Sequence, residues 1–440
     1  MRYIPNTSDD RREMLAAIGV SSVEELFSDI PQDIVDRFEA LGLPAHSEQE
    51  TVAHVSALAD RNRAHQAVCL LGGGVYDHYV PSIVGHVLSR SEFYTAYTPY
   101  QPEISQGTLT AMFEFQTMVC ELTGMEVANA SMYDGATALA ESVLMADRIR
   151  REGGIAVPRT LHPRFRRVLD TYCWAADVEI VEIPYGEDGR IDRAAMPDAP
   201  AAVVVQSPNA FGVIERLDGL KERLGEGLLI VAVNPLSLGI LSPPGEHGAD
   251  IVVGEGQPLG LPMGMGGPLL GLFATRERHI RQMPGRVSGR TVDAEGKIGY
   301  AMAAQTREQH IRRERATSNI CTNSALCALA ATVYLASVGA EGLRHVAELN
   351  LQKAHYLAGR LSELNGFRLA FDGDFFNEFT VEVPGDPQEL RRTLRDAGFL
   401  VTDPDELRGL GVENALRFAV TERRTIEELD RLVDVLRGAR

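Results

Sequence analysis

Three tyrosines stand close together in a segment that does not fit a regular element. Tyr94, Tyr97 and Tyr100 lie in the run from Phe93 to Gly107, which two prolines interrupt. Prolines this close together are not compatible with a central strand, and the run has no helical period. Phenol rings can stack on a flat ligand and donate hydrogen bonds. The run is predicted to be a loop, either a purely structural one or one that faces an active site or an interface.

A second segment is suited to hold an anion. The stretch that begins at Asn129 ends in Gly135, Ala136 and Thr137, and a helical pattern follows it. The N-terminus of a helix directs free backbone N–H groups and the positive end of its dipole toward a bound phosphate or carboxylate. The same pattern also describes an ordinary capped helix, so the residues alone leave both interpretations open.

A third segment packs His310 and four arginines into one charged stretch and then becomes polar. The charged part is typical of a solvated helix face with paired charges one turn apart. Thr317, Ser318 and Asn319 follow it and precede a long apolar helical pattern. Their side chains are suited to contact an oxyanion or a phosphate.

Gln257 occupies a position where covalent chemistry would need a lysine. The run 251–253 is predicted to be a buried strand, and it leads into a glycine-rich turn at Gly264, Gly266 and Gly267. Enzymes that use pyridoxal phosphate (PLP) present a lysine at such a place, because only a primary amine forms an imine with the cofactor aldehyde. Gln257 therefore predicts a PLP site that has lost its covalent anchor.

Lysine is scarce in the whole chain, which contains only Lys221, Lys297 and Lys353. Lys221 and Lys353 lie in amphipathic helical patterns and are expected at solvated positions. Lys297 is flanked by polar turn residues and follows no buried strand. None of the three is expected to replace the missing amine.

The composition limits the classes of function. The chain has 61 acidic and 43 basic residues and a net charge of −18, which argues against nucleic acid or an anionic membrane as a partner. The amino terminus lacks the apolar core of a signal peptide, and no uninterrupted apolar run reaches the roughly 18 residues that span a bilayer. The five cysteines are widely spaced without a C-x-x-C pair, which argues against a disulfide framework or a metal site and favours the cytoplasm.

The periodicity predicts three regions. Residues 1–65 are expected to form a helical arm, with capping boxes at Ser22–Glu25 and Ser47–Glu50. In residues 66–324, short apolar strands alternate with helical patterns, which favours a large α/β domain with a mostly parallel sheet. Residues 325–440 are predicted to form a smaller α/β domain. The expected strands are 178–183, 202–206, 228–233, 250–253, 270–274, 378–383 and 416–420.

Several long strings of the chain resemble those of glycine decarboxylase, the P-protein of the glycine cleavage system. The likeness is greatest to the amino-terminal subunit (subunit 1) of the bacterial two-subunit form. It extends over essentially the whole chain and is carried by residues 95–107, 128–137, 243–254, 305–314 and 316–323.

This resemblance implies a PLP-dependent transferase large domain of the aminotransferase-like type (fold type I). It implies that PLP is bound covalently by subunit 2 and not by this chain, in an α2β2 assembly. The pair would decarboxylate glycine, release CO2 and transfer the aminomethyl group to the lipoyl arm of H-protein. Such an enzyme is an oxidoreductase that acts on CH–NH2 with a disulfide acceptor, and this chain alone is expected to be inactive.

Asn234 is a second departure that the resemblance brings out. It follows the predicted strand 228–233, where such folds place an aspartate that keeps the pyridine nitrogen protonated, and an amide does this poorly. Together with Gly135, Ala136, Thr137 and Gln257, it is expected to mark a degenerate site of this chain.

Fold type I sites form at dimer interfaces, so the chain is also expected to lend residues to its partner. The resemblance places Tyr94, Tyr97 and Tyr100 at the active site of the partner. Thr317, Ser318 and Asn319 are expected to lie toward the phosphate of the partner's PLP.

Three other interpretations stay open at this point. The chain could be a self-sufficient PLP enzyme that uses Lys297. It could be a structural scaffold that binds the catalytic subunit and adds nothing to its site. It could also use the fold to bind an unrelated small molecule, which the long matching strings disfavour.

Overall fold

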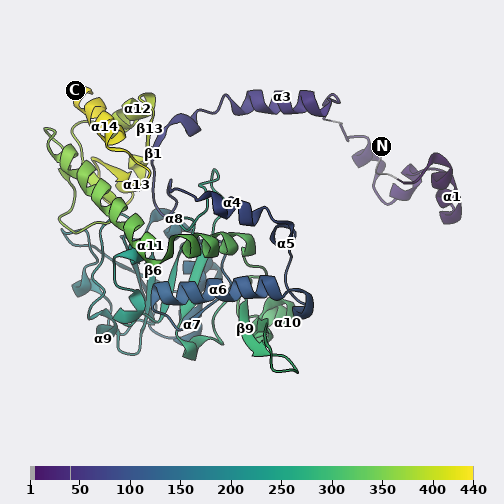
Figure 1. Cartoon of the computed structure of the whole chain (residues 1–440), viewed down its shortest axis with the longest axis horizontal. Coiled ribbons are helices and arrows are strands. Elements are labelled where there is room, and N and C mark those ends of the chain that lie inside the picture. The colour runs from purple at the N-terminus through teal and green to yellow at the C-terminus, as the bar shows by residue number, and fades with distance from the viewer. Residues whose placement is uncertain (1–4, 40, 440) are drawn as a thin grey trace. The chain divides into compact units, whose positions relative to one another are not determined.

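The computed structural model describes residues 5–39 and 41–439, and the chain divides into two compact units, Met1–His65 and Gln66–Arg440. The first unit is a series of short helices (Figure 1). No residue described in this unit is buried, so its helices have no core of their own. Its elements are α1 (Ser8–Ile18), η1 (Glu24–Phe27), α2 (Gln32–Val35) and α3 (Glu48–Ala59).

Local capping defines the ends of these arm helices. The predicted capping box at Ser47 is confirmed, since its hydroxyl accepts from the N–H of Glu50 and the Glu50 side chain returns the bond. A second box at Thr7 heads α1. Only half of the predicted box at Ser22 forms. The Ser22 hydroxyl accepts from the N–H of Glu25 (3.3 Å), but the Glu25 carboxylate accepts from Ser21 instead of Ser22, and a short 3-10 helix follows.

A seven-stranded sheet forms the centre of the second unit, in the order β2-β8-β7-β6-β5-β3-β4. Strands β3 to β7 pair in parallel, whereas β8 runs antiparallel to β7 and β2 antiparallel to β8. The prediction of a mostly parallel sheet is confirmed. The strands are β2 (Val127–Ala128), β3 (Ile155–Pro158), β4 (Ile180–Ile183), β5 (Ala202–Ser207), β6 (Leu228–Val233), β7 (Ile251–Glu255) and β8 (Gly271–Thr275).

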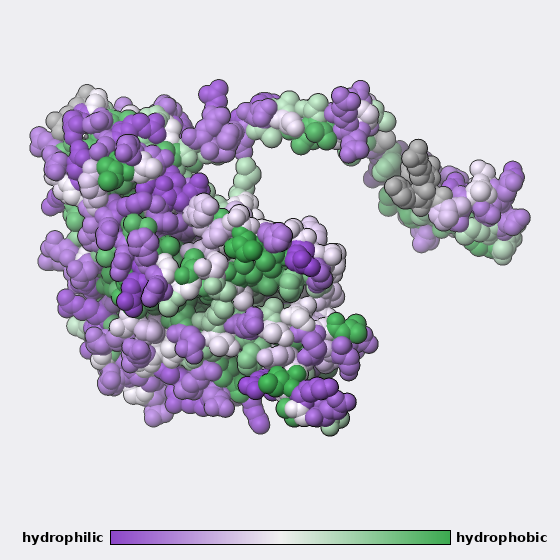
Figure 2. Space-filling view, viewed as in Figure 1, coloured by the Kyte–Doolittle hydropathy of each residue, from purple (hydrophilic) through white to green (hydrophobic). Residues whose placement is uncertain are grey.

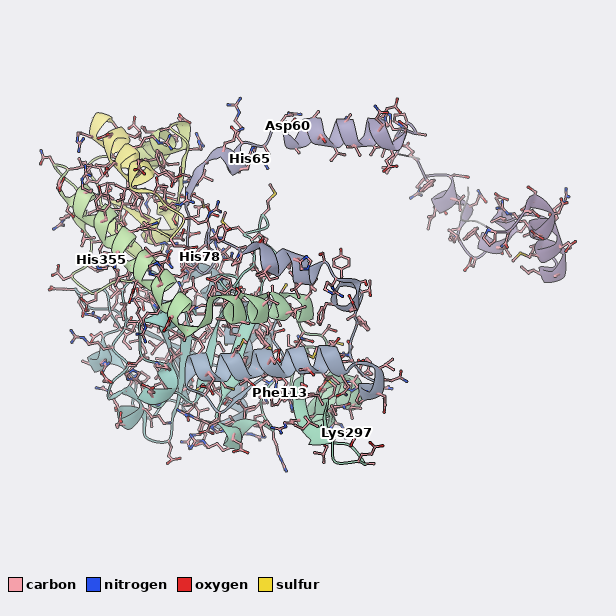
Figure 3. All side chains as sticks on the ribbon, viewed as in Figure 1. Asp60, His65, His78, Phe113, Lys297 and His355 are labelled. Carbon is pink, nitrogen blue, oxygen red and sulfur yellow. The ribbon has the colours of Figure 1, made fainter. Side chains whose placement is uncertain are left out.

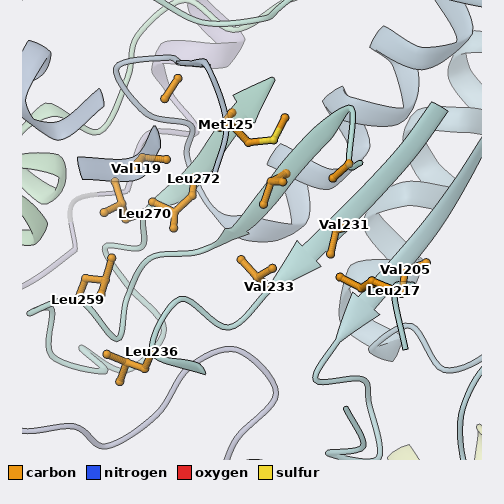
Figure 4. Packing of buried hydrophobic residues seen from close by; sticks show 14 of the residues in the cluster. Val119, Met125, Val205, Leu217, Val231, Val233, Leu236, Leu259, Leu270 and Leu272 are labelled. Carbon is orange, nitrogen blue, oxygen red and sulfur yellow. The ribbon is translucent and has the colours of Figure 1, made fainter. Parts of the chain in front are cut away.

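Helices cover both faces of this sheet, and the period of two in each strand explains how. Figure 4 shows the packing on one face. Val231 and Val233 of β6 pack with α6 (Gln106–Thr123), α9 (Leu220–Leu224) and the start of α11. Ile230 and Ala232 pack on the other face with α7 (Gly135–Ile149) and α8 (Pro163–Ala176). A strand buried on both faces must be apolar throughout, which is why β6 could be predicted residue for residue.

A hairpin and two strands of the sheet, β2 and β3, were not expected. Strands β9 (Val287–Val292) and β10 (Ile298–Ala303) pair antiparallel, and their turn is exposed. β3 is buried but only four residues long, so it is too short for its pattern to stand out. The hairpin strands and β3 contain polar or small residues, which weaken the hydrophobic periodicity from which strands are predicted.

The C-terminal part begins with α11 (Ala325–Ser362), which is broken at Gly339, where φ is 62°. The long apolar helical pattern predicted after Asn319 corresponds to the half of α11 before this break. Among the described residues, α11 is the one helix long and apolar enough to cross a membrane, and its Ala328, Ala331 and Tyr334 pack in the core beneath the sheet. The elements that follow α11 are β11 (Arg368–Leu369), β12 (Glu378–Glu382), α12 (Pro387–Asp396), β13 (Phe399–Val401), α13 (Pro404–Arg408), β14 (Ala415–Ala419) and α14 (Ile426–Gly438). The earlier strand β1 (Val68–Leu70) joins them by pairing with β13.

Candidate functional site

The side chain of Gln257, just past the end of β7, is fully buried and all of its polar atoms are used. The backbone N–H of Tyr76 donates to Oε1 of Gln257 (2.9 Å), and Nε2 of Gln257 donates back to the carbonyl of Tyr76 (3.1 Å). Nε2 also donates to the carbonyl of Leu261 (2.7 Å). The amide therefore fastens the segment around Tyr76 across the end of the strand.

The helix N-terminus that could hold an anion is occupied by side chains of this chain. Gly135, Ala136 and Thr137 form the first turn of α7, and Asp134 caps it by accepting from the N–H of Thr137 (2.7 Å). The N–H of Gly135 donates to Oε2 of Glu255 (2.9 Å). The donors expected to face a phosphate thus face two carboxylates.

Glu255 is buried beside this turn and accepts two more backbone hydrogen bonds, from Gln257 (3.0 Å) and Leu270 (3.1 Å). Burial raises the pKa of Glu255 to about 7, although all three backbone donors favour the charged form. Its carboxyl group stands where α7 would otherwise direct its N–H groups at a ligand.

The glycine-rich segment before Tyr76, residues 71–74, is bound on its other side by Glu378 of β12. Gly73 N–H donates to Oε1 of Glu378 (2.8 Å), and the hydroxyl of Tyr76 donates to Oε2 (2.8 Å). A Cβ at Gly72 would collide with Glu378, and one at Gly73 with His162. These glycines therefore mark a tight approach of the backbone to its neighbours.

A buried charge cluster completes this contact. The guanidinium of Arg417 bonds Oε2 of Glu406 (3.0 Å) and the carbonyl of Ala210 (2.7 Å), and its Nε lies 3.7 Å from Oε1 of Glu378. Burial and the charge of Arg417 hold the pKa of His162 well below its usual range. Arg417 and Glu406 thus form a largely buried ion pair, beside which His162 is held in its neutral form.

Asn234 lies after β6, as predicted. Its Oδ1 accepts from the N–H of Leu236 (3.1 Å), and its Nδ2 donates to Oδ1 of Asn377 (3.4 Å). The cavity beside Asn234 measures about 20 Å³ and is lined by Tyr76, Phe165, Gln206 and Glu255 among others. A space of this size holds about one water molecule.

The tyrosine-rich segment is solvent-exposed, with α5 (Ser91–Tyr94) at its start. Tyr94, Tyr97 and Tyr100 are 68%, 78% and 50% exposed. Tyr94 and Tyr97 line a second, larger pocket of about 220 Å³ between α5, α6 and the start of α11. Figure 2 shows apolar side chains gathered on this face of the molecule, over α4 (Ser82–Leu88) and α11.

The segment before α11 contributes to the pocket with residues other than those predicted. Thr322 and Asn323 line it, whereas Thr317, Ser318 and Asn319 do not. The pocket also contains Arg286, from the start of the β9 hairpin. Nothing in the local sequence around Arg286 indicates this role, since only the fold brings it beside the tyrosines.

The three lysines are all engaged elsewhere. Lys297 lies in the hairpin turn, 74% exposed, with its ammonium 2.6 Å from Glu295 (Figure 3). Lys221 pairs with the buried Asp250 (2.8 Å), and Lys353 donates to the carbonyl of Arg424 (2.6 Å). The prediction of solvated positions is therefore wrong for Lys221 and Lys353, which are partly buried and paired, because the stems of both lie against neighbouring elements. No group of three possible metal ligands occurs in residues 5–39 and 41–439.

This architecture is the aminotransferase-like fold type I of PLP-dependent enzymes. A glutamate decarboxylase of Lactobacillus brevis shares the fold with a TM-score of 0.69 at 14% identity, covering 95% of this chain and 96% of that one. Within this class, the chain belongs to the glycine cleavage system P-protein family, whose sequence profile matches residues 1–436.

Individual relatives agree over their full lengths. The chain is 50% identical to a probable glycine dehydrogenase (decarboxylating) subunit 1 of Desulfitobacterium hafniense, covering 98% of each chain. It is also 50% identical to the protein of the same name from Carboxydothermus hydrogenoformans, covering 100% of each. A crystal structure of glycine decarboxylase (P-protein) in inhibitor-bound form superposes with a TM-score of 0.92, at 44% identity and 100% coverage of both chains.

The residues of this chain do not fit the PLP that its fold family implies. Gln257, at the position where the sequence pattern predicts the lysine of a PLP site, has its amide bound to Tyr76 and Leu261. The carboxylate of Glu255 accepts the hydrogen bond of Gly135 N–H at the N-terminus of α7, where a phosphate would bind. The cavity beside Asn234 measures about 20 Å³, which is too small for the PLP ring. The sequence shows that residue 257 is not a lysine, whereas only the fold brings Glu255 and the segment around Tyr76 to this place.

Proposed function

We propose that this chain is the subunit without a catalytic lysine in a two-subunit glycine dehydrogenase (decarboxylating). Together with a homologous subunit that carries PLP, it would decarboxylate glycine. The carboxylate leaves as CO2, and the aminomethyl carbon bonds to one sulfur of the lipoyl disulfide of H-protein while the other sulfur is reduced to a thiol. The relatives named subunit 1 support this role.

One observation carries the division of labour between the subunits. The amide of Gln257 is fully buried and makes three hydrogen bonds to backbone groups. Because both polar atoms of this amide are hydrogen-bonded to backbone groups, the side chain of Gln257 cannot take part in catalysis. PLP would therefore be bound covalently by the partner, and this chain alone would be inactive.

The tyrosine-rich segment is the part that this chain would lend to its partner. Tyr94, Tyr97 and Tyr100 are exposed although each carries an aromatic ring, and two of them line a pocket on the same face. Rings exposed in this way are typical of surfaces that another molecule covers. Thr317, Ser318 and Asn319 stay weaker candidates for contact with the partner's PLP phosphate.

The proposed complex is an α2β2 assembly in the cytoplasm, with glycine as substrate and lipoylated H-protein as the second partner. The net charge of −18 supports a partner set without nucleic acid or an anionic membrane surface.

Borohydride trapping tests this assignment directly. The reconstituted complex is incubated with PLP, reduced and analysed by peptide mass spectrometry, with Lys297→Met as the control variant. We expect pyridoxyl-lysine on the partner subunit alone, in the native complex and in the variant. A reduced adduct on Lys297 that disappears in Lys297→Met would replace the proposal by a self-sufficient PLP enzyme.

A further inference from the structure

The pocket beside the tyrosine-rich segment has an apolar wall with one buried cation in it. Its volume is about 220 Å³, and Phe93, Ala111, Met112 and Leu326 form much of its lining. The charged residue in the lining is Arg286, whose side chain is only 3% exposed. An arginine buried to this degree is normally paired with a carboxylate or a phosphate.

The guanidinium of Arg286 is not fully paired among the described residues. Nη1 donates to the hydroxyl of Thr98 (2.9 Å) and Nη2 to the hydroxyl of Tyr100 (3.2 Å), which are both neutral acceptors. Nε is buried without a hydrogen-bond partner in the described chain. The five N–H donors of the guanidinium are therefore served by only two acceptors.

The nearest carboxylate does not complete the pairing. Oε2 of Glu308 lies 3.6 Å from Nε of Arg286, beyond hydrogen-bond distance, and 3.5 Å from Nδ1 of His310. Glu308 thus lies between Arg286 and His310, near the outer limit of an ion pair with Arg286. Arg286 therefore keeps a buried donor without a partner in the described chain, and it lines the pocket.

We propose that this pocket binds an oxyanion, a carboxylate or a phosphate, and that Arg286 is the residue that recognises it. Thr98 and Tyr100 hold the guanidinium plane in position, and the apolar wall lowers the local dielectric, which strengthens the attraction. This inference rests on the proposed function and deepens it, because the same segment would face the partner's active site. The two sources of such an anion there are the carboxylate of glycine and the phosphate of the partner's PLP.

The test uses the reconstituted complex with Arg286→Met and Arg286→Lys, and Arg290→Met as the matched control. Arg290 lies four residues further along the chain, on β9, and is exposed. Three quantities are measured for each: KM for glycine and kcat in glycine–bicarbonate exchange, and Kd for PLP by absorbance titration of the apo complex. Loss of a buried charged partner should raise one constant in Arg286→Met by about tenfold or more.

The affected constant identifies the source of the anion. A higher KM for glycine at unchanged Kd for PLP assigns the carboxylate, and a higher Kd for PLP assigns the phosphate. Arg286→Lys should recover part of the loss, because it keeps the charge without the planar fork. Arg290→Met should stay within about twofold of the native complex, as is usual for surface changes.

A direct binding measurement protects the test against a misfolded variant. Acetate and inorganic phosphate are titrated into the apo complex, and the shift in melting temperature is compared between the native chain and Arg286→Lys. We expect one of the two anions to raise the melting temperature of the native complex, and to raise that of the Arg286→Lys complex by a smaller amount.

Two results would overturn the proposal while the proposed function stands. One is a complex with Arg286→Met in which both constants stay native. The other is a fall in kcat alone without rescue by lysine, which would make Arg286 only a support of the loop. If the partner subunit catalysed exchange without this chain, the proposed function itself would fail, whatever Arg286 does.

Discussion

Gln257 and Tyr76 hold each other through a reciprocal pair of hydrogen bonds, although 181 residues separate them in the sequence. Both groups of the side-chain amide are used, one as acceptor and one as donor. The side-chain amide bonds the N–H and the carbonyl of Tyr76, as the backbone of a neighbouring β-strand would. It closes the end of β7 with backbone from the start of the second unit.

Gln257→Leu should lower the free energy of unfolding, because it leaves buried groups of Tyr76 and Leu261 without partners. Each group left unpaired costs about 1–3 kcal/mol. Urea denaturation followed by circular dichroism measures the change. The control Gln352→Leu, at an exposed position on α11, should change stability by less than about 0.5 kcal/mol. Equal midpoints for both variants would contradict a structural role for this amide.

Gln257→Lys should not restore cofactor binding to this chain. The new amine would enter a buried position next to a space of about 20 Å³, in which a PLP ring has no room. Borohydride reduction of the variant with PLP, followed by peptide mapping, should find no adduct at position 257. A stoichiometric adduct there would show that the site needs only its amine.

Tyr97→Phe and Tyr100→Phe separate a contributing subunit from a scaffold. Each removes one hydroxyl at an exposed position, so folding should be preserved. If the loop serves the partner's site, glycine–bicarbonate exchange should fall by about tenfold or more in at least one variant. Tyr79→Phe, also exposed but outside the loop, is the control. Native rates in both loop variants would favour the scaffold.

The ionisation of Glu255 should make the chain less stable as the pH rises. Burial raises its pKa from 4.5 to about 7 in the folded state, so the folded chain binds more protons than the unfolded chain between these values. Its contribution to stability is greatest below about pH 4.5 and declines until about pH 7. The free energy of unfolding of Glu255→Gln, relative to that of the native chain, should therefore be higher at pH 8 than at pH 5, by up to about 3 kcal/mol.

Thermal unfolding at the two pH values measures this difference. Glu187→Gln, at an exposed position, is the control and should follow the native chain at both. If Glu255→Gln also followed the native chain at both pH values, Glu255 would not titrate in this range.

Arg417→Met should destabilise the fold strongly. It removes the cation that pairs with Glu406 and lies beside Glu378, in a place where the arginine side chain is 1% exposed. Breaking a buried pair in this way costs about 3–5 kcal/mol. Arg391→Met, whose pair with Asp403 is more than a third exposed on both sides, should cost less than about 1 kcal/mol in the same denaturation experiment. Similar losses in the two variants would contradict the importance of burial.

The central strands could be predicted because burial dictates their composition. β6 lies between helices on both faces, so all of its residues must be apolar, and its predicted limits agree with the structure. The hairpin β9–β10 and the strand β3 could not, since an exposed turn and a short run give little periodic contrast.

The candidate site could be predicted only in part, for a similar reason. The sequence itself shows that residue 257 is not a lysine. The prolines among the three tyrosines predict that their segment is a loop. Arg286, Thr322 and Asn323 have ordinary local surroundings, so only their shared pocket distinguishes them.

The sequence by itself determined that this chain has no amine at the end of β7, that its sheet is mostly parallel and that its family is that of the P-protein. These follow from residue identity, periodicity and long matching strings, all of which are local. Only the tertiary structure decided what fills the place of the missing chemistry. Tyr76 reaches Gln257, Glu255 reaches the first turn of α7, and Arg286 reaches Tyr100, across separations of 120 to 186 residues. Contacts over such distances depend on how whole layers pack, which no local pattern encodes.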